Sequence, residues 1–288
     1  MDSRFAGRSA PLVVALLIAS LGSSACAQWA NGLPERPGLP TLWIIGDSTV
    51  RNGQDAGGNG QWGWGNPIAS YFDQTKINVQ NRAMGGTSSR SYINLGLWDK
   101  VMAEIKPGDY LIMQFGHNDG GALDDPARAR GTLSGNGEET KEIDNPITHQ
   151  HEVVHTYGWY LRKYIADAKS KGIEHAIICS PIPRNLWNAG KMNRDKRAPV
   201  GMAAAKQAGA DFIDLNELIA SRYDTEGQKK VTDTYFPEKE TTHTEWAGAV
   251  LNADCVVSGI KALAQNDLKN YILSTPPIDL KNPSGKPR

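Results

Sequence analysis

Two distant blocks of this chain hold the residue types from which a nucleophilic serine is built. Ser48 lies in the sequence GDST (residues 46–49), and His243 ends the sequence ETTH (residues 240–243). A serine hydroxyl is a poor nucleophile until an imidazole accepts its proton, and an acidic side chain must orient that imidazole. Because both blocks supply the required groups, the pattern predicts acyl-transfer chemistry with Ser48 as nucleophile and His243 as base.

Two further blocks offer hydrogen-bond donors for the oxyanion that forms when an ester carbonyl is attacked. Gly86 lies in GGTS (residues 85–88), and Asn118 lies in GHND (residues 116–119). A glycine leaves its backbone N–H open to approach, an asparagine amide adds a side-chain donor, and the Ser48 N–H is the third. Each block alone is typical of a turn. Together, in this order and at successive strand ends, they favour a serine esterase.

The blocks must be positioned by the elements that precede them. Short apolar runs alternate with helical patterns from residue 41 onward, which predicts a parallel sheet covered by helices on both faces. Functional residues of such sheets gather at the carboxyl ends of the strands. We therefore predict an α/β fold, a single three-layer sandwich around a five-stranded parallel sheet of flavodoxin-like type. The predicted strands span residues 42–45, 76–80, 110–115, 176–179 and 211–213, and the predicted helices span residues 65–73, 99–105, 152–169 and 246–263.

The composition excludes several classes of protein. The 288 residues include 31 Lys and Arg against 31 Asp and Glu, whereas a nucleic-acid-binding protein normally carries a basic excess. No apolar run reaches the roughly 20 residues of a membrane span, and three cysteines are too few for a disulfide-stapled scaffold. We expect a signal peptide at residues 1–27, a proline-rich leader at 28–40, one catalytic domain at 41–265 and a C-terminal extension at 266–288.

The N-terminal segment has the three parts of a secretory signal peptide. Two arginines precede an apolar stretch at residues 11–21, and Ala25-Cys26-Ala27 supplies the small residues of a cleavage site. We therefore expect a secreted or periplasmic protein, with a lipid anchor at Cys26 as the less favoured alternative. Cys179 and Cys255 then remain, and they either pair in an oxidising compartment or stay as buried thiols, because both lie in apolar stretches.

The four blocks together resemble those of the SGNH (or GDSL) hydrolase superfamily. Longer stretches resemble carbohydrate esterase family 12, the rhamnogalacturonan acetylesterases, and the likeness covers nearly all of residues 41–263. The stretches that carry it are NRAMGGTSSRSY (81–92), GTLSGNGEETKEIDNPITHQHEVVHTYGWYLRKY (131–164), SPIPRNLW (180–187) and THTEWAGA (242–249).

The resemblance implies a role for each block. Ser48 would be the nucleophile and His243 the base, with the oxyanion bound by the Ser48 N–H, the Gly86 N–H and the Asn118 amide. The family usually has aspartate where this chain has Glu240. A glutamate can orient an imidazole as well, so we expect Glu240 to complete the site. The resemblance implies no metal and no organic cofactor.

The sequence HEVVH matches the pattern in which two histidines on a zinc-protease helix hold the metal. On a helix His151 and His155 would share a face, and Glu152 would act as base to a zinc-bound water. The third histidine of such a helix is replaced by Leu161, which belongs to the apolar stripe. A zinc protease is therefore the less favoured alternative, and a bound metal at His149, His151 and His155 stays open.

Aromatic and basic residues near the predicted strand ends suit a sugar substrate. Flat aromatic faces pack on sugar rings, and a guanidinium pairs with the carboxylate of a uronic acid. The sequence predicts substrate contacts from Trp62, Trp64, Arg90, Arg184 and Trp187, with burial in the core as the alternative for the tryptophans. We expect a serine esterase that removes O-acetyl groups from a plant cell-wall polysaccharide, with rhamnogalacturonan favoured. The alternatives are a xylan acetylesterase, a lipase or a thioesterase of the same superfamily.

Overall fold

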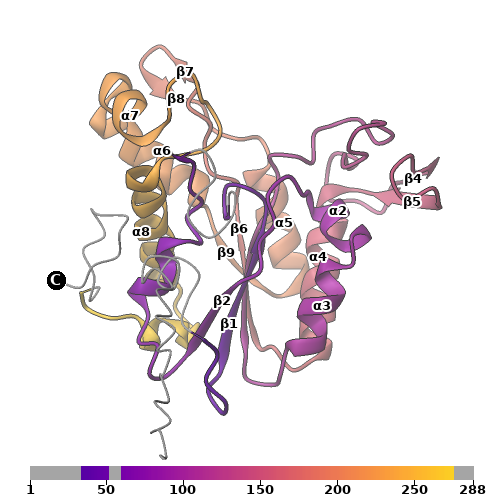
Figure 1. The fold of residues 1–288 in the computed structure, drawn as a ribbon, viewed down its shortest axis with the longest axis horizontal. Coiled ribbons are helices and arrows are strands. Elements are labelled where there is room, and N and C mark those ends of the chain that lie inside the picture. Colours follow the sequence, from indigo (N-terminus) through magenta and orange to yellow (C-terminus); the bar gives the residue numbers. More distant parts are fainter. Residues whose placement is uncertain (1–33, 52–59, 276–288) are drawn as a thin grey trace, which may run out of the picture.

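A five-stranded parallel sheet forms the centre of the molecule, as predicted (Figure 1). The structure, a computed structural model, describes residues 34–51 and 60–275, so the expected signal peptide and the start of the leader lie outside the described residues. The strand order is β2-β1-β3-β6-β9, and each neighbouring pair is parallel. The strands are β1 (Thr41–Gly46), β2 (Asn78–Asn81), β3 (Tyr110–Gln114), β6 (His175–Cys179) and β9 (Asp211–Ile213).

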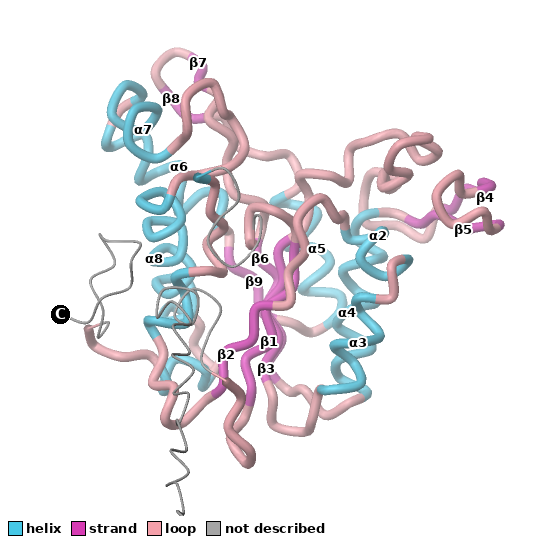
Figure 2. Tube along the Cα trace, in the orientation of Figure 1, coloured by secondary structure: helices cyan, strands magenta, loops and turns pink. Residues whose placement is uncertain are grey.

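Helices cover both faces of the sheet and make the three predicted layers (Figure 2). Side chains alternate across a strand, so Leu42 and Ile44 of β1 enter one core while Trp43 and Ile45 enter the other. The Trp43 face is covered by α2 (Ser89–Asn94), α3 (Leu97–Glu104), α4 (Tyr157–Ser170) and α5 (Ala198–Ala208). The Leu42 face is covered by η2 (Pro67–Tyr71), α6 (Leu215–Glu226), α7 (Gln228–Tyr235), α8 (Trp246–Ala262) and η3 (Asp267–Tyr271).

The helix predicted over residues 152–169 is wrong in its first turn. Residues His151–His155 form β5, which pairs antiparallel with β4 (Thr140–Asp144), and this hairpin projects from the sandwich (Figure 1). Two adjacent valines favour a strand, and α4 begins only after Thr156, whose side chain accepts a hydrogen bond from the Trp159 N–H. A second small hairpin, β7 (Trp187–Asn188) with β8 (Lys191–Met192), was not predicted either.

The segment after α8 packs against the amino-terminal side of the sheet. Leu268 is fully buried, and Asp267 accepts a hydrogen bond from the Tyr110 hydroxyl at 2.8 Å. Cys179 and Cys255 are both free and buried, and burial raises the pKa of Cys255 to about 12. Within residues 34–51 and 60–275, no helix has the length and apolar character needed to cross a membrane.

Candidate active site

The structure brings Ser48, His243 and Glu240 together in hydrogen-bonding order. Ser48 follows the carboxyl end of β1, and His243 lies in the loop before α8. The Nε2 atom of His243 lies 2.8 Å from Ser48 Oγ, and its Nδ1 atom lies 3.3 Å from Glu240 Oε2. In this arrangement a carboxylate can orient the imidazole while the other ring nitrogen accepts the serine proton.

The Glu240 carboxylate is fixed by its own loop. Oε1 accepts hydrogen bonds from the backbone N–H groups of Thr241, Thr242 and His243 at 2.9, 2.7 and 3.3 Å. Oε2 accepts one from the Gln61 side chain at 2.9 Å in addition to facing His243. Partial burial alone would raise the pKa of Glu240, but the hydrogen bonds from Thr242 and His243 lower it below its ordinary value. Glu240 therefore stays ionised beside the imidazole. The contact from Gln61 had no signal in the sequence.

The turn that presents Ser48 depends on its neighbours in the GDST block. A Cβ atom at Gly46 would lie 2.5 Å from the Gln114 carbonyl oxygen, so only glycine fits between β1 and β3. Asp47 is fully buried, and its Oδ1 atom accepts hydrogen bonds from the Thr49 N–H and hydroxyl at 2.9 and 2.7 Å. The Ser48 side chain is left 8% exposed at the end of this rigid turn.

The three predicted oxyanion donors follow three neighbouring strands, with Ser48 after β1, Gly86 after β2 and Asn118 after β3. Gly86 has φ +83°, a conformation that glycine adopts without strain. The N–H groups of Ser48 and Gly86 donate to no partner within the described part of the chain. Asn118 Nδ2 donates to the Thr87 carbonyl at 2.7 Å, which orients the amide and leaves its second hydrogen for a ligand. These groups can bind a developing oxyanion.

The two tryptophans of the loop after Ser48 are core residues, which corrects the prediction that they contact substrate. Trp64 is fully buried and donates to the Gln114 side chain at 2.9 Å. Trp62 is 9% exposed and packs edge-to-face on Trp246, with ring centroids 4.7 Å apart. Its backbone exchanges hydrogen bonds with Thr244, so Trp62 holds the loop that carries His243 instead of forming a platform for sugar.

Arg90 is also a structural residue, which corrects its predicted role in substrate binding. Its side chain is fully buried and donates to both carboxylate oxygens of Glu152 at 2.7 and 2.6 Å. Its remaining terminal nitrogen donates to the carbonyls of Leu123 and Gly131 at 2.9 and 2.8 Å. All three guanidinium nitrogens are therefore engaged inside the protein, and Arg90 cannot reach a ligand.

Arg184 and Trp187 follow β6 and keep partly exposed side chains. Arg184 donates to the Thr242 hydroxyl and, at 3.2 Å, to the His117 carbonyl, so it joins the loop of His243 to the loop after β3. The Trp187 indole N–H donates to Asn185 at 2.8 Å. Contact between these two residues and a substrate stays a prediction.

The HEVVH sequence does not form the helical zinc motif. In β5 the Glu152 side chain lies on the face opposite to His151 and His155 and accepts hydrogen bonds from Arg90, Asn94 and Asn145. His155 stacks on Trp159 with ring centroids 3.6 Å apart. A base for a zinc-bound water is therefore missing, and no cluster of three potential ligands from His, Cys, Asp and Glu occurs among the described residues.

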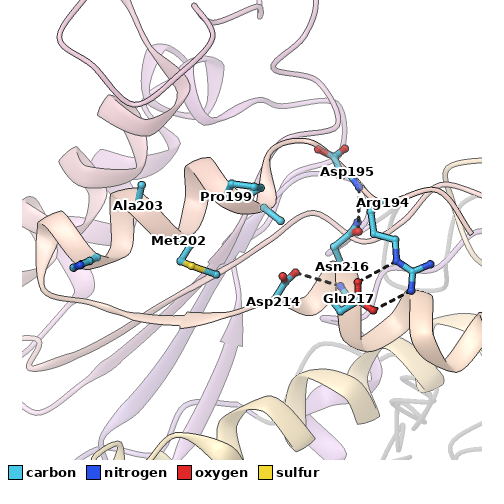
Figure 3. Close-up of a pocket in the computed structure, with 10 residues that line it drawn as sticks. Arg194, Asp195, Pro199, Met202, Ala203, Asp214, Asn216 and Glu217 are labelled. Carbon is cyan, nitrogen blue, oxygen red and sulfur yellow. Dashed lines mark hydrogen bonds and ion pairs between the residues drawn. The ribbon is translucent and has the colours of Figure 1, made fainter.

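A pocket of about 490 Å³ lies between α5 and the start of α6 (Figure 3). Several of its polar groups bond to one another. Arg194 pairs with Glu217 at 2.9 Å, and the Asp195 N–H donates to Asn216 at 3.0 Å. Asp214 caps α6 by accepting from the Glu217 N–H. Because neither Ser48 nor His243 lines it, this pocket offers a ligand no reactive group.

Comparison with known proteins identifies the family. Residues 44–248 match the model of the GDSL-like lipase/acylhydrolase family. The chain therefore belongs to this family, the predicted relationship to SGNH hydrolases is confirmed, and the protein is an enzyme, a carboxylic ester hydrolase.

Individual relatives show which proteins of known name this chain is similar to. A rhamnogalacturonan acetylesterase of Emericella nidulans is 31% identical over 233 residues, covering 79% of this chain and 88% of the relative. The probable rhamnogalacturonan acetylesterase YesY of Bacillus subtilis is 33% identical over 230 residues, covering 77% of this chain and 93% of the relative. The crystal structure of YxiM from Bacillus subtilis has a TM-score of 0.58 at 25% identity, covering 77% of this chain. This chain spans 56% of the YxiM chain.

Proposed function

We propose that this enzyme removes O-acetyl groups from a plant cell-wall polysaccharide, with rhamnogalacturonan as the polymer. The observation that carries the proposal is the hydrogen-bonded series from Ser48 Oγ through His243 to Glu240, at 2.8 and 3.3 Å. The polymer is suggested by the two relatives named as rhamnogalacturonan acetylesterases. Export to the periplasm or the medium, where such a polymer occurs, fits the signal-peptide pattern of residues 1–27.

The reaction begins with proton transfer from Ser48 Oγ to His243 Nε2 as the oxygen attacks the acetyl carbonyl carbon. The carbonyl oxygen becomes an oxyanion, which accepts hydrogen bonds from the N–H groups of Ser48 and Gly86 and from Asn118 Nδ2. When the intermediate collapses, protonated His243 gives its proton to the departing sugar oxygen, and the acetyl group remains on Ser48. Glu240 stabilises the imidazolium that exists between the two transfers.

A second half-reaction restores the enzyme. His243 accepts a proton from a water molecule, whose oxygen attacks the acetyl carbon on Ser48. The same three donors bind the second oxyanion. Collapse breaks the bond between the acetyl carbon and Ser48 Oγ, His243 returns its proton to the serine oxygen, and acetate leaves. Over the two half-reactions, water is the only co-reactant, and acetate and the free sugar hydroxyl are the products.

Acetate release from acetylated rhamnogalacturonan tests the proposal. Ser48→Ala should lower the rate roughly 10⁴-fold or more, since removal of a catalytic serine eliminates the acyl-enzyme route. Ser170→Ala, which removes a hydroxyl from the far end of α4, is the matched control and should retain the wild-type rate. Equal rates for wild type and Ser48→Ala would contradict the mechanism. Faster release from acetylated xylan than from rhamnogalacturonan would instead contradict the proposed polymer.

A further inference from the structure

A second pocket, of about 350 Å³, lies beside Gly86 in the loop after β2. Gly86 forms part of its wall, so the pocket adjoins one of the three candidate oxyanion donors. The side chains of Met84, Leu95 and Ile147 line it and are 46%, 53% and 41% exposed. Exposed apolar side chains in a concave surface suit the C–H faces of a sugar ring.

The charges of this pocket all have one sign. Its only charged lining residues are Arg128 and Arg130. Within the described part of the chain neither has a carboxylate within salt-bridge distance, whereas Arg90 and Arg194 each have at least one such partner. Arg130 donates to the Gly86 carbonyl at 2.7 Å. Burial and the neighbouring Arg128 charge lower the pKa of Arg130, and the more distant carboxylates of Asp125, Asp47 and Asp119 offset this only in part. The two charges that line the pocket therefore repel each other, and an anion bound between them would relieve that repulsion.

A tight turn fixes the two arginines on either side of one residue. The Asp125 carbonyl accepts hydrogen bonds from the N–H groups of Arg128 and Ala129 at 3.1 and 2.8 Å, and its side chain accepts from Ala127. Ala129 is buried and has φ +40°, a left-handed conformation that is uncommon for a residue with a Cβ atom. Such a conformation persists only where the surrounding structure enforces it, so the backbone that carries the two arginines is fixed before a ligand arrives.

We propose that Arg128 and Arg130 bind the carboxylate of a uronic acid residue while the acetyl ester of the same or the adjacent sugar lies at Ser48. A guanidinium binds a carboxylate through two parallel N–H groups, which fixes orientation as well as charge. The acid would hold the polymer in register with the Gly86 donor next to it. This inference rests on the proposed polysaccharide function and adds to it the residues that select an acidic polymer.

The test compares two forms of one substrate. Acetylated rhamnogalacturonan oligosaccharides are used as they are and after carbodiimide conversion of their carboxylates to neutral amides. The kcat/KM for acetate release is measured on both forms at low salt for wild type, Arg128→Gln, Arg130→Gln and the double variant. Arg36→Gln is the matched control, because Arg36 lies beside Asn78 at the amino-terminal edge of the sheet and its loss changes net charge equally.

Wild type should prefer the carboxylate form roughly tenfold or more, through KM, since each well-formed guanidinium–carboxylate contact has about that effect. The preference should fall with added salt and disappear in the double variant, while Arg36→Gln retains it. The Arg128 side chain donates to no described residue, so Arg128→Gln should lower the preference in a folded enzyme.

A wild type without preference, or a double variant that keeps it, overturns the subsite but leaves the esterase intact. Failure of wild type to release acetate from either form contradicts the proposed function and the subsite with it.

Discussion

At the scale of single residues, Glu240 is the acidic side chain that orients His243. The position of Glu240 could be predicted from the sequence, but not whether a side chain one methylene longer than aspartate would fit there. The structure accommodates that length because the 240–243 loop turns back on the carboxylate. Three successive N–H groups bind Oε1, and Oε2 is left to face His243 Nδ1 and Gln61. The loop therefore suits glutamate in this chain.

We predict that Glu240→Gln lowers kcat on a simple acetate ester by about 10²–10⁴-fold, because the amide can still occupy the loop but cannot stabilise the imidazolium. Glu240→Asp keeps the charge yet shortens the reach to His243, and a misplacement near 1 Å should cost about 10²-fold. Initial rates with p-nitrophenyl acetate give both values. Wild-type activity in Glu240→Gln would show that Glu240 has no part in orienting His243.

Residue types in short blocks were the most predictable part of the site. Ser48, Gly86, Asn118 and His243 each follow a strand or precede a helix, so topology alone brings them to one edge of the sheet. Trp62 was less predictable, because an aromatic in a glycine-rich loop fits a sugar platform and a buried clamp equally well. The structure separates the two roles through the burial of Trp62, its packing on Trp246 and its hydrogen bonds with Thr244.

At the scale of elements, the parallel sheet was predicted correctly and the start of α4 was not. Val154, Tyr157 and Leu161 have the spacing of a helix face, and all three are buried. Val154, however, reaches the core from β5, where side chains alternate between the two faces of the hairpin. The periodicity of apolar residues records which side chains are buried, and it cannot tell a strand that runs into a helix from one longer helix.

The hairpin is joined to α2 by the ion pair between Arg90 and Glu152, of which Arg90 is fully buried. We predict that Arg90→Met lowers the free energy of unfolding by about 3–5 kcal/mol, because it leaves the Glu152 charge without its partner. Arg222→Met, which removes an exposed arginine 3.9 Å from Asp254, should change it by only about 0–1 kcal/mol. Urea denaturation gives both numbers. An Arg90→Met enzyme of wild-type stability with a raised KM would restore Arg90 as a substrate residue.

At the scale of the whole molecule, the formal net charge is zero, yet positive charge is in excess near the candidate active site. Across the described residues most arginines are ion-paired, while Arg128, Arg130 and Arg184 lie near the site without a carboxylate partner. The positions of Arg128 and Arg130 could not be predicted from the sequence, since both lie in a polar insert after β3, at about residues 120–150, that has no periodicity of apolar residues. Their proximity to Gly86 arises only when the insert folds back over the loop after β2.

Asp119 links the loop after β3 to the start of α2, and its ionisation should affect the stability of the whole fold. Its Oδ1 atom accepts hydrogen bonds from the Ser89 N–H, at 3.1 Å, and from the Ser89 hydroxyl, but its Oδ2 atom is buried without a partner among the described residues. Burial outweighs these bonds and raises the pKa of Asp119 to about 7. An unfolded aspartate has a pKa near 3.9.

Between about pH 4 and pH 7 the folded protein therefore binds a proton at Asp119 that the unfolded chain has released. The folded state is favoured by that proton, so its stability should fall by roughly 1.4 kcal/mol per unit as pH rises through this window, and the loss is complete above pH 7. Asp119→Asn keeps an acceptor for Ser89 and removes the ionisation, so the excess of its free energy of unfolding over that of wild type should grow from pH 4 to pH 7 and then stay level.

Denaturation at several pH values measures this difference, with Asp124→Asn on the exposed part of the same loop as the charge-matched control. A difference between Asp119→Asn and wild type that is constant with pH would show that the buried carboxyl is ionised throughout and that the Ser89 hydrogen bonds outweigh burial.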